Sequence, residues 1–164
     1  MIDIFVHYFS IVTFVYIFRQ MFSKACEYGI GAAVFIAQKS LVQCRVNLNS
    51  VAKALDSPVA YTSKVLQILA HEEIISSGMG PKGGYYMNTE QLKNIKLKDI
   101  VKAIDGDQIY IGCGLGLPAC NKEKPCSVHF QFVNLRDQLK DMLETTTIRS
   151  LATSASKGVT YLKR

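Results

Sequence analysis

Two short helical patterns lie on either side of Asp56-Ser57-Pro58, and a glycine-rich segment follows them. The first pattern begins at Asn49, an expected N-cap, and ends near Leu55. The second begins near Pro58, because proline is favoured in the first turn of a helix, and ends near Glu72. Two short helices joined by a turn of three or four residues are typical of a helix-turn-helix.

The glycine-rich segment runs from Gly78 to Gly84 and separates two short strand candidates, residues 74–77 and 85–87. Glycine reaches positive φ values and lets backbone N–H groups come close to another molecule, such as a phosphate backbone. An ordinary glycine hairpin is the alternative interpretation. This alternative is disfavoured because the segment comes directly after a helical pair. The sequence therefore predicts a winged helix-turn-helix DNA-binding domain over residues 21–105, with a further short helix at 96–105.

The composition is that of a folded protein. The chain has 164 residues, of which 49% are hydrophobic, and this excludes a disordered chain. Its net charge of +6 favours an acidic partner such as nucleic acid. Residues 21–112 carry 10 basic and 8 acidic groups, and residues 113–164 carry 8 and 4, so the DNA assignment depends on the motifs rather than on charge. No base–nucleophile pair stands out, so an enzyme is not predicted.

Residues 1–20 differ from the rest, because fourteen of the twenty are apolar. A transmembrane helix needs about 20 apolar residues, but Asp3 and His7 interrupt this stretch. A signal peptide needs a basic start and a small-residue cleavage site, and neither is present. Since Met21 opens the globular pattern, we interpret residues 1–20 as a start-site artefact, with a membrane-associated segment as the alternative. We expect a cytoplasmic protein without a membrane partner unless this leader is real.

Three of the five cysteines, Cys113, Cys120 and Cys126, lie within fourteen residues, and His129 follows them. Thiolates are soft ligands that select zinc, copper(I) or iron–sulfur clusters. Structural zinc prefers short paired spacings, whereas gaps of six and five residues suit a larger object, an iron–sulfur cluster with one ligand that is not cysteine. Unligated thiols or a redox disulfide are the alternative. Residues 106–126 are therefore predicted to be a cluster-binding loop.

The last helical pattern covers residues 127–149. Its apolar positions repeat at 4-3-4-3 spacing, which is typical of a coiled coil, and they are Val128, Phe132, Leu135, Leu139 and Met142. A second copy of the chain is the expected partner, and packing on its own domain is the alternative. Residues 150–164 are predicted to be a flexible tail. The predicted fold is mainly α with a small β-hairpin wing, followed by a long C-terminal dimerisation helix.

These motifs, in this order, resemble the Rrf-two family of transcription regulators. The resemblance covers residues 21–150 and includes the opening Met21-Phe22-Ser23-Lys24 with Tyr28, the wing at 80–85 and the helix at 100–105. It implies a homodimer that binds a double-stranded DNA operator, with an affinity that an iron–sulfur cluster tunes. A regulator of the same fold that senses by thiol oxidation or a small ligand is the alternative, and a membrane-anchored iron–sulfur electron-transfer protein is a remote one.

The resemblance also implies site residues. The cluster, 2Fe–2S in preference to 4Fe–4S, would be held by Cys113, Cys120 and Cys126. The fourth ligand would be His129 or, alternatively, Glu27 from the partner subunit. The second helix of the helix-turn-helix would enter the major groove. The residues expected to contact DNA are Lys24, Ser57, Tyr61, Ser63, Lys64, Lys82 and Gly83.

Two positions and one spacing depart from the family pattern. Met79 stands where many members have an arginine before the wing's Gly-Pro, and Lys82 replaces a usual glycine. The first gap between the cysteines is six residues, where five is common. The changes in the wing lead us to expect a different operator preference. The longer gap leaves the cluster type open between 2Fe–2S and 4Fe–4S.

Overall fold

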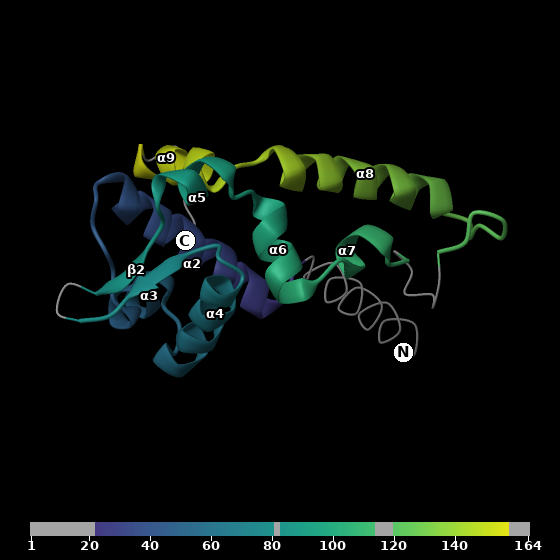
Figure 1. Ribbon diagram of the computed structural model, residues 1–164. Helices are drawn as coiled ribbons and strands as arrows, with labels where there is room; N and C mark the ends of the chain where they lie inside the picture. Colours follow the sequence, from purple (N-terminus) through teal and green to yellow (C-terminus); the bar gives the residue numbers. More distant parts are fainter. Residues whose placement is uncertain (1–21, 81–82, 114–119, 158–164) are drawn as a thin grey trace, which may run out of the picture.

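The computed structural model describes residues 22–80, 83–113 and 120–157. The apolar leader at residues 1–20 and the candidate Lys82 lie outside these ranges. The described part is mostly helical and contains one two-stranded antiparallel hairpin, which confirms the predicted fold class (Figure 1). No helix in these ranges is long and apolar enough to cross a membrane.

Helix α2 (Lys24–Leu41) is the centre of the fold. Ser23 is its N-cap, and its hydroxyl accepts a hydrogen bond from the N–H of Cys26 at 3.1 Å. Apolar residues recur along one side of the helix at helical spacing, and four of them, Ala33, Val34, Ile36 and Ala37, are fully buried. Helices α3, α4, α6 and α9 all pack against α2, so one core serves the whole molecule.

The helix-turn-helix consists of α3 (Leu48–Leu55) and α4 (Val59–His71). Asn47 caps α3, because its side chain accepts a hydrogen bond from the N–H of Ser50 at 2.8 Å. The prediction of Asn49 as N-cap was wrong, since the helix begins at Leu48, two residues before the start that a cap at Asn49 implies. Asp56 ends α3 in the left-handed conformation, at φ 52°, and the chain turns there.

The wing is the hairpin of β1 (Ser76–Gly78) and β2 (Gly84–Tyr86), in which Ser76 faces Tyr86 and Gly78 faces Gly84. Ile74 and Ile75, which we predicted to start the first strand, precede it and are buried in the core. Gly84 has φ 132°, and a Cβ there would lie 2.7 Å from the carbonyl oxygen of Val46. This position therefore requires glycine.

Two short helices were not predicted. Helix α5 (Thr89–Asn94) begins with a capping box, in which Asn88 and Gln91 each bond to the other's backbone N–H. Helix α7 (Gln108–Ile111) begins inside the region predicted as an irregular loop. Between them, α6 (Leu97–Asp105) confirms the helix predicted for residues 96–105.

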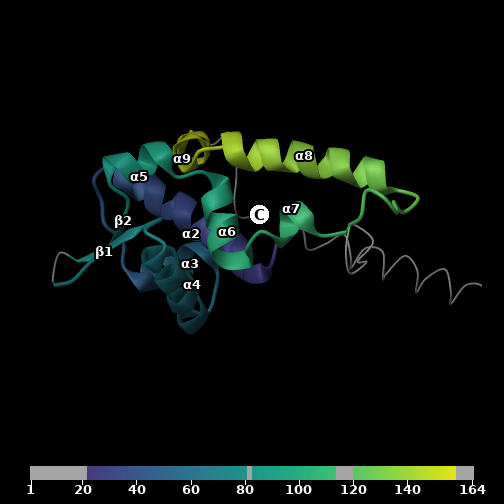
Figure 2. The ribbon, with the colours of Figure 1, turned by 45° about the vertical axis from the view of Figure 1, so that its right-hand side comes forward.

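The C-terminal region contains two helices, α8 (His129–Thr145) and α9 (Ile148–Ser156). The flexible tail predicted from residue 150 was wrong as far as Ser156, because α9 packs on α2. Thr147 caps α9, and Ile148 and Ala152 on its inner face are fully buried. The predicted tail residues 158–164 lie outside the described part. The long helix predicted for residues 127–149 is thus interrupted after Thr145, where α8 ends. Figures 1 and 2 show α8 running along one side of the molecule and beyond α7.

Candidate DNA-binding surface and cysteine site

Helix α4 has one buried and one exposed face. Val65, Leu66 and Leu69 are buried in the core. On the other face, Tyr61 and Lys64 are exposed, and Ser63 is half-buried. The residues expected to contact DNA on α4 are therefore accessible, and the apolar residues between them fix the helix to the rest of the domain.

Ser57 is positioned by hydrogen bonds within the chain. The hydroxyl of Thr62 donates to the carbonyl oxygen of Pro58 at 3.0 Å, and the hydroxyl oxygens of Ser57 and Thr62 are 2.6 Å apart. Since the single proton of Thr62 is directed to Pro58, Ser57 is the donor to Thr62. Ser57 could donate to a phosphate only if this bond opened.

An aromatic contact connects the start of α2 to the exposed face of α4. The rings of Tyr28 and Tyr61 meet edge to face, with centroids 5.6 Å apart. The ammonium of Lys24 lies 5.6 Å from the centre of the Tyr28 ring and 2.6 Å from the carboxylate of Glu27. Two predicted site residues, Lys24 and Glu27, are thus paired with each other.

The wing is supported by Arg45, a residue that the sequence analysis did not single out. Its guanidinium lies 4.2 Å from the centre of the Tyr86 ring in β2. A Cβ on Gly78 would lie 2.7 Å from a guanidinium nitrogen of Arg45, so a larger residue at this position would displace the end of the arginine side chain. Gly83, expected to contact DNA, donates its N–H to the carbonyl oxygen of Gly80 at 2.8 Å, and Met79 is fully exposed.

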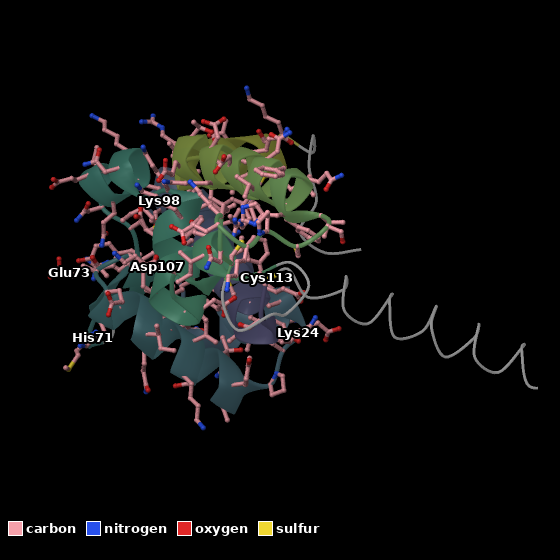
Figure 3. All side chains as sticks on the ribbon, turned by 90° about the vertical axis from the view of Figure 1, so that its right-hand side faces the viewer. Lys24, His71, Glu73, Lys98, Asp107 and Cys113 are labelled. Carbon is pink, nitrogen blue, oxygen red and sulfur yellow. The ribbon has the colours of Figure 1, made fainter. Side chains whose placement is uncertain are left out.

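The far end of α4 lies away from Lys24. His71 pairs with Glu72 at 3.0 Å. Figure 3 shows His71 and Glu73 at the edge of the molecule opposite Lys24. We use the name candidate DNA surface for the three places that carry the residues expected to contact DNA: the start of α4, the start of α2 and the wing.

The cysteine site centres on a contact between Cys120 and His129. The sulfur of Cys120 is 3.3 Å from Nδ1 of His129, whose side chain is 3% exposed at the start of α8. The backbone N–H of His129 donates to the carbonyl oxygen of Cys126 at 3.0 Å. The histidine thus touches two of the three cysteine positions predicted as ligands, one through its side chain and one through its backbone.

Arg136, also on α8, contacts two residues of the loop, Gly112 and Cys120. One guanidinium nitrogen donates to the carbonyl oxygen of Gly112 at 2.7 Å, and the other lies 3.6 Å from the sulfur of Cys120. Sequence reasoning missed this residue. Its spacing of seven from His129, which places both on one face of a helix, could have indicated it.

The donor atoms fit a cluster in type, but the structure does not gather them. Cys113, Cys120 and Cys126 are half-buried, and none of the five cysteines, all of which are described, takes part in a disulfide. Soft sulfur donors with one imidazole are a suitable ligand set for an iron–sulfur cluster. Among the described residues, no three His, Cys, Asp or Glu side chains lie close enough to hold a metal ion.

The other two cysteines lie outside this site. Cys26 is fully buried in the core, and burial, with the nearby carboxylate of Asp105, raises the pKa of its thiol to about 12. Since the thiolate is the form that binds metals and reacts, Cys26 is a packing residue. Cys44 is exposed at the end of α2.

Asp105 connects the DNA-binding domain to the cysteine loop. It is the last residue of α6, and residues 106–126 follow it directly. Its carboxylate accepts hydrogen bonds from the N–H of Ser23, at 2.8 Å, and from the Ser23 hydroxyl. Ser23 precedes Lys24, so the start of α2 and the start of the loop are held together by one side chain.

A winged helix-turn-helix joined by a cysteine-rich loop to a long helix defines a transcription regulator that binds DNA. The model of the Rrf2 (Rrf-two) family, an iron-dependent transcriptional regulator, matches residues 22–154. The chain belongs to this family. Its members are transcription regulators rather than enzymes, which confirms the prediction made from the sequence.

Individual relatives agree with this assignment. An HTH-type transcriptional regulator of Aquifex aeolicus (strain VF5) is 27% identical over 147 residues, which are 88% of this chain and 100% of the relative. The structure of CymR, the global cysteine regulator of B. subtilis, is similar with a TM-score of 0.66 and 23% identity, covering 80% of this chain and 95% of CymR. The structure of T. potens IscR is similar with a TM-score of 0.64 and 19% identity, and the match covers 85% of this chain and 91% of IscR.

Proposed function

We propose that the protein is a dimeric cytoplasmic regulator whose affinity for a DNA operator depends on an iron–sulfur cluster held by Cys113, Cys120, Cys126 and His129. The observation that carries the proposal is the contact of 3.3 Å between Cys120 and the buried His129. It brings a thiol and an imidazole together at the end of the loop, as a mixed ligand set requires. When bound, the cluster supplies a centre that responds to oxidation and nitric oxide.

His129 is favoured over Glu27 as the fourth ligand. The imidazole already lies beside one of the cysteines, whereas the carboxylate of Glu27 is paired with Lys24 at 2.6 Å. Glu27 would have to give up this ion pair before it could reach a cluster in a partner subunit.

DNA binding follows from the exposed start of α4. Helix α4 enters the major groove, where Tyr61, Ser63 and Lys64 contact the DNA. Lys24, together with Lys82 and Gly83 of the wing, contacts the phosphate backbone. Such contacts set the register and the salt dependence, while base contacts give the sequence preference.

Coupling between the two sites runs through Asp105. A rearrangement of residues 106–126 moves the end of α6, and the hydrogen bonds of Asp105 carry that movement to Ser23 and the start of α2. Since Lys24 follows Ser23, the spacing of the DNA contacts in a dimer depends on the loop.

The test compares operator affinity in the cluster-loaded and cluster-free protein at one salt concentration, after anaerobic purification. We expect a brown protein whose visible absorbance is lost in Cys113→Ala and His129→Ala and retained in the control Glu27→Ala. We also expect at least a tenfold difference in operator affinity between the two forms, within the usual range of coupling energies. Equal operator affinities in the cluster-loaded and cluster-free protein would contradict the proposal that the cluster controls DNA binding.

A regulator of the same fold that senses by thiol oxidation is the second candidate. The similarity to S. aureus CymR in an oxidized form favours it, with a TM-score of 0.62, 24% identity and 79% of this chain covered. In this case the anaerobic protein is colourless, and peroxide alone changes its operator affinity. Replacement of Cys120 by serine then removes the response to peroxide.

A further inference from the structure

We propose that Arg136 is a positioning residue that holds the cysteine loop on α8 and sets the place of Cys120. This inference rests on the proposed sensing role of the loop, but it can be tested without a cluster. The other site residues follow from the motifs, whereas the role of Arg136 is argued from its contacts in the structure.

The geometry gives Arg136 two partners that are distant in sequence from it and from each other. Gly112 comes directly before Cys113, and Cys120 is eight residues further along the chain. One planar guanidinium donates to the first at 2.7 Å and lies 3.6 Å from the second. Gly112 and Cys120 are therefore both held by a single side chain.

Arg136 lies on the same face of α8 as His129, seven residues earlier. The sulfur of Cys120 is thus contacted from two turns of one helix, by the imidazole at 3.3 Å and by the guanidinium. Helix α7, which ends one residue before Gly112, also packs on α8. Arg136 therefore joins α7, the loop and α8.

The chemistry requires arginine rather than any cation. The guanidinium presents five N–H donors in a fixed plane, so it can point one donor at a carbonyl oxygen and another at a sulfur. A lysine ammonium is a point charge on a flexible chain and cannot span both partners in the same way. The positive charge also lies beside a sulfur that would carry negative charge as a cluster ligand.

The first measurement is amide hydrogen exchange of the cluster-free full chain, followed in peptides that cover α7 and residues 120–126. In Arg136→Gln we expect these amides to exchange about tenfold faster, because two hydrogen bonds from a charged group are lost. Arg136→Lys should exchange at an intermediate rate. The control is Lys140→Gln, an exposed cation one turn further along α8, which should exchange as the unmodified chain does.

Exchange in Arg136→Gln at the rate of the control overturns the proposal. If Arg136→Gln does not fold, Arg136→Lys decides: exchange identical to the unmodified chain overturns the proposal, and faster exchange supports it. These outcomes are independent of the cluster, so a chain that never binds one contradicts the proposed function and leaves the role of Arg136 standing.

A second measurement uses the reconstituted protein. Hydrogen bonds to cluster sulfurs and nearby charge set the reduction potential. Removal of a cation disfavours the more negative reduced form, so Arg136→Gln should have a lower potential than Lys140→Gln. Equal potentials in the two variants contradict the placement of Arg136 beside a cluster ligand.

Discussion

The five cysteines differ in their surroundings, and the surroundings decide what each can do. Cys26 lies in the core beside Asp105, while Cys120 contacts an imidazole and a guanidinium. The same thiol group is therefore a packing residue at one position and a candidate ligand at the other. Sequence spacing separated the three loop cysteines from the other two.

The raised pKa of Cys26 predicts a loss of stability at alkaline pH. The unfolded thiol titrates at its ordinary value of 9.0, and burial raises the pKa to about 12 in the folded chain. Between these values the folded state keeps a proton that the unfolded state releases, so rising pH favours unfolding. The contribution is complete below pH 9 and is lost as the pH rises through the folded value of about 12.

This prediction is checked by urea unfolding across that pH range. Cys26→Ala should weaken the pH dependence, although its stability at neutral pH is lower because a buried side chain is truncated. The comparison is therefore between slopes against pH. A slope unchanged by the substitution contradicts the assignment to Cys26.

At the scale of elements, capping residues fixed the helix boundaries. Ser23 caps α2, and the cap of α3 is Asn47 rather than the predicted Asn49. Both asparagines are reasonable caps by residue type, and two residues separate them. The choice depends on the bridge between Val46 and Tyr85, which keeps the chain extended up to Asn47.

A pair of substitutions tests the cap of α3. Asn47→Ala should lower the free energy of unfolding by about 1 kcal/mol, because the N–H of Ser50 loses its acceptor. Asn49→Ala, inside the helix and exposed, should leave stability unchanged or raise it slightly, since alanine is the better helix former. Thermal unfolding of the two variants is the measurement, and equal melting temperatures would contradict the assignment.

The missed elements have two physical causes. Helix α7 is four residues long, and α5 is six, so neither contains enough turns for an apolar periodicity to be visible. The tail was predicted as flexible because it is rich in Ser and Thr. Its small residues nevertheless form an inner face, and helix α9 is stable because α2 accepts that face.

At the scale of the whole molecule, α8 exposes large apolar side chains that its own domain does not cover. Phe130, Leu135 and Met142 are 73%, 57% and 44% exposed, while Leu143 on the inner face is fully buried. One side of α8 thus packs on its own domain, while other parts of its surface leave apolar side chains exposed. The outer face supports the proposal that α8 packs against a second copy of the chain.

Leu135→Glu is expected to shift the protein from dimer to monomer, because it would bury a charge in an apolar interface. Light scattering after size-exclusion chromatography measures the mass, and Gln138→Glu, an exposed polar position on the same helix, is the control. The monomer should also bind a two-fold symmetric operator at least tenfold more weakly. A dimer that persists in Leu135→Glu places the interface elsewhere.

The sequence by itself determined the order of the parts: a helix-turn-helix, a glycine hairpin, a cysteine loop and an amphipathic helix. These follow from local rules of spacing, turn chemistry and capping, which act over a few residues. Only the tertiary structure decided that Ser23 bonds to Asp105, that Arg45 supports the wing at Tyr86, and that Arg136 reaches both Gly112 and Cys120. Such contacts join residues up to 82 positions apart. They depend on how the helices pack around α2, which no local pattern records.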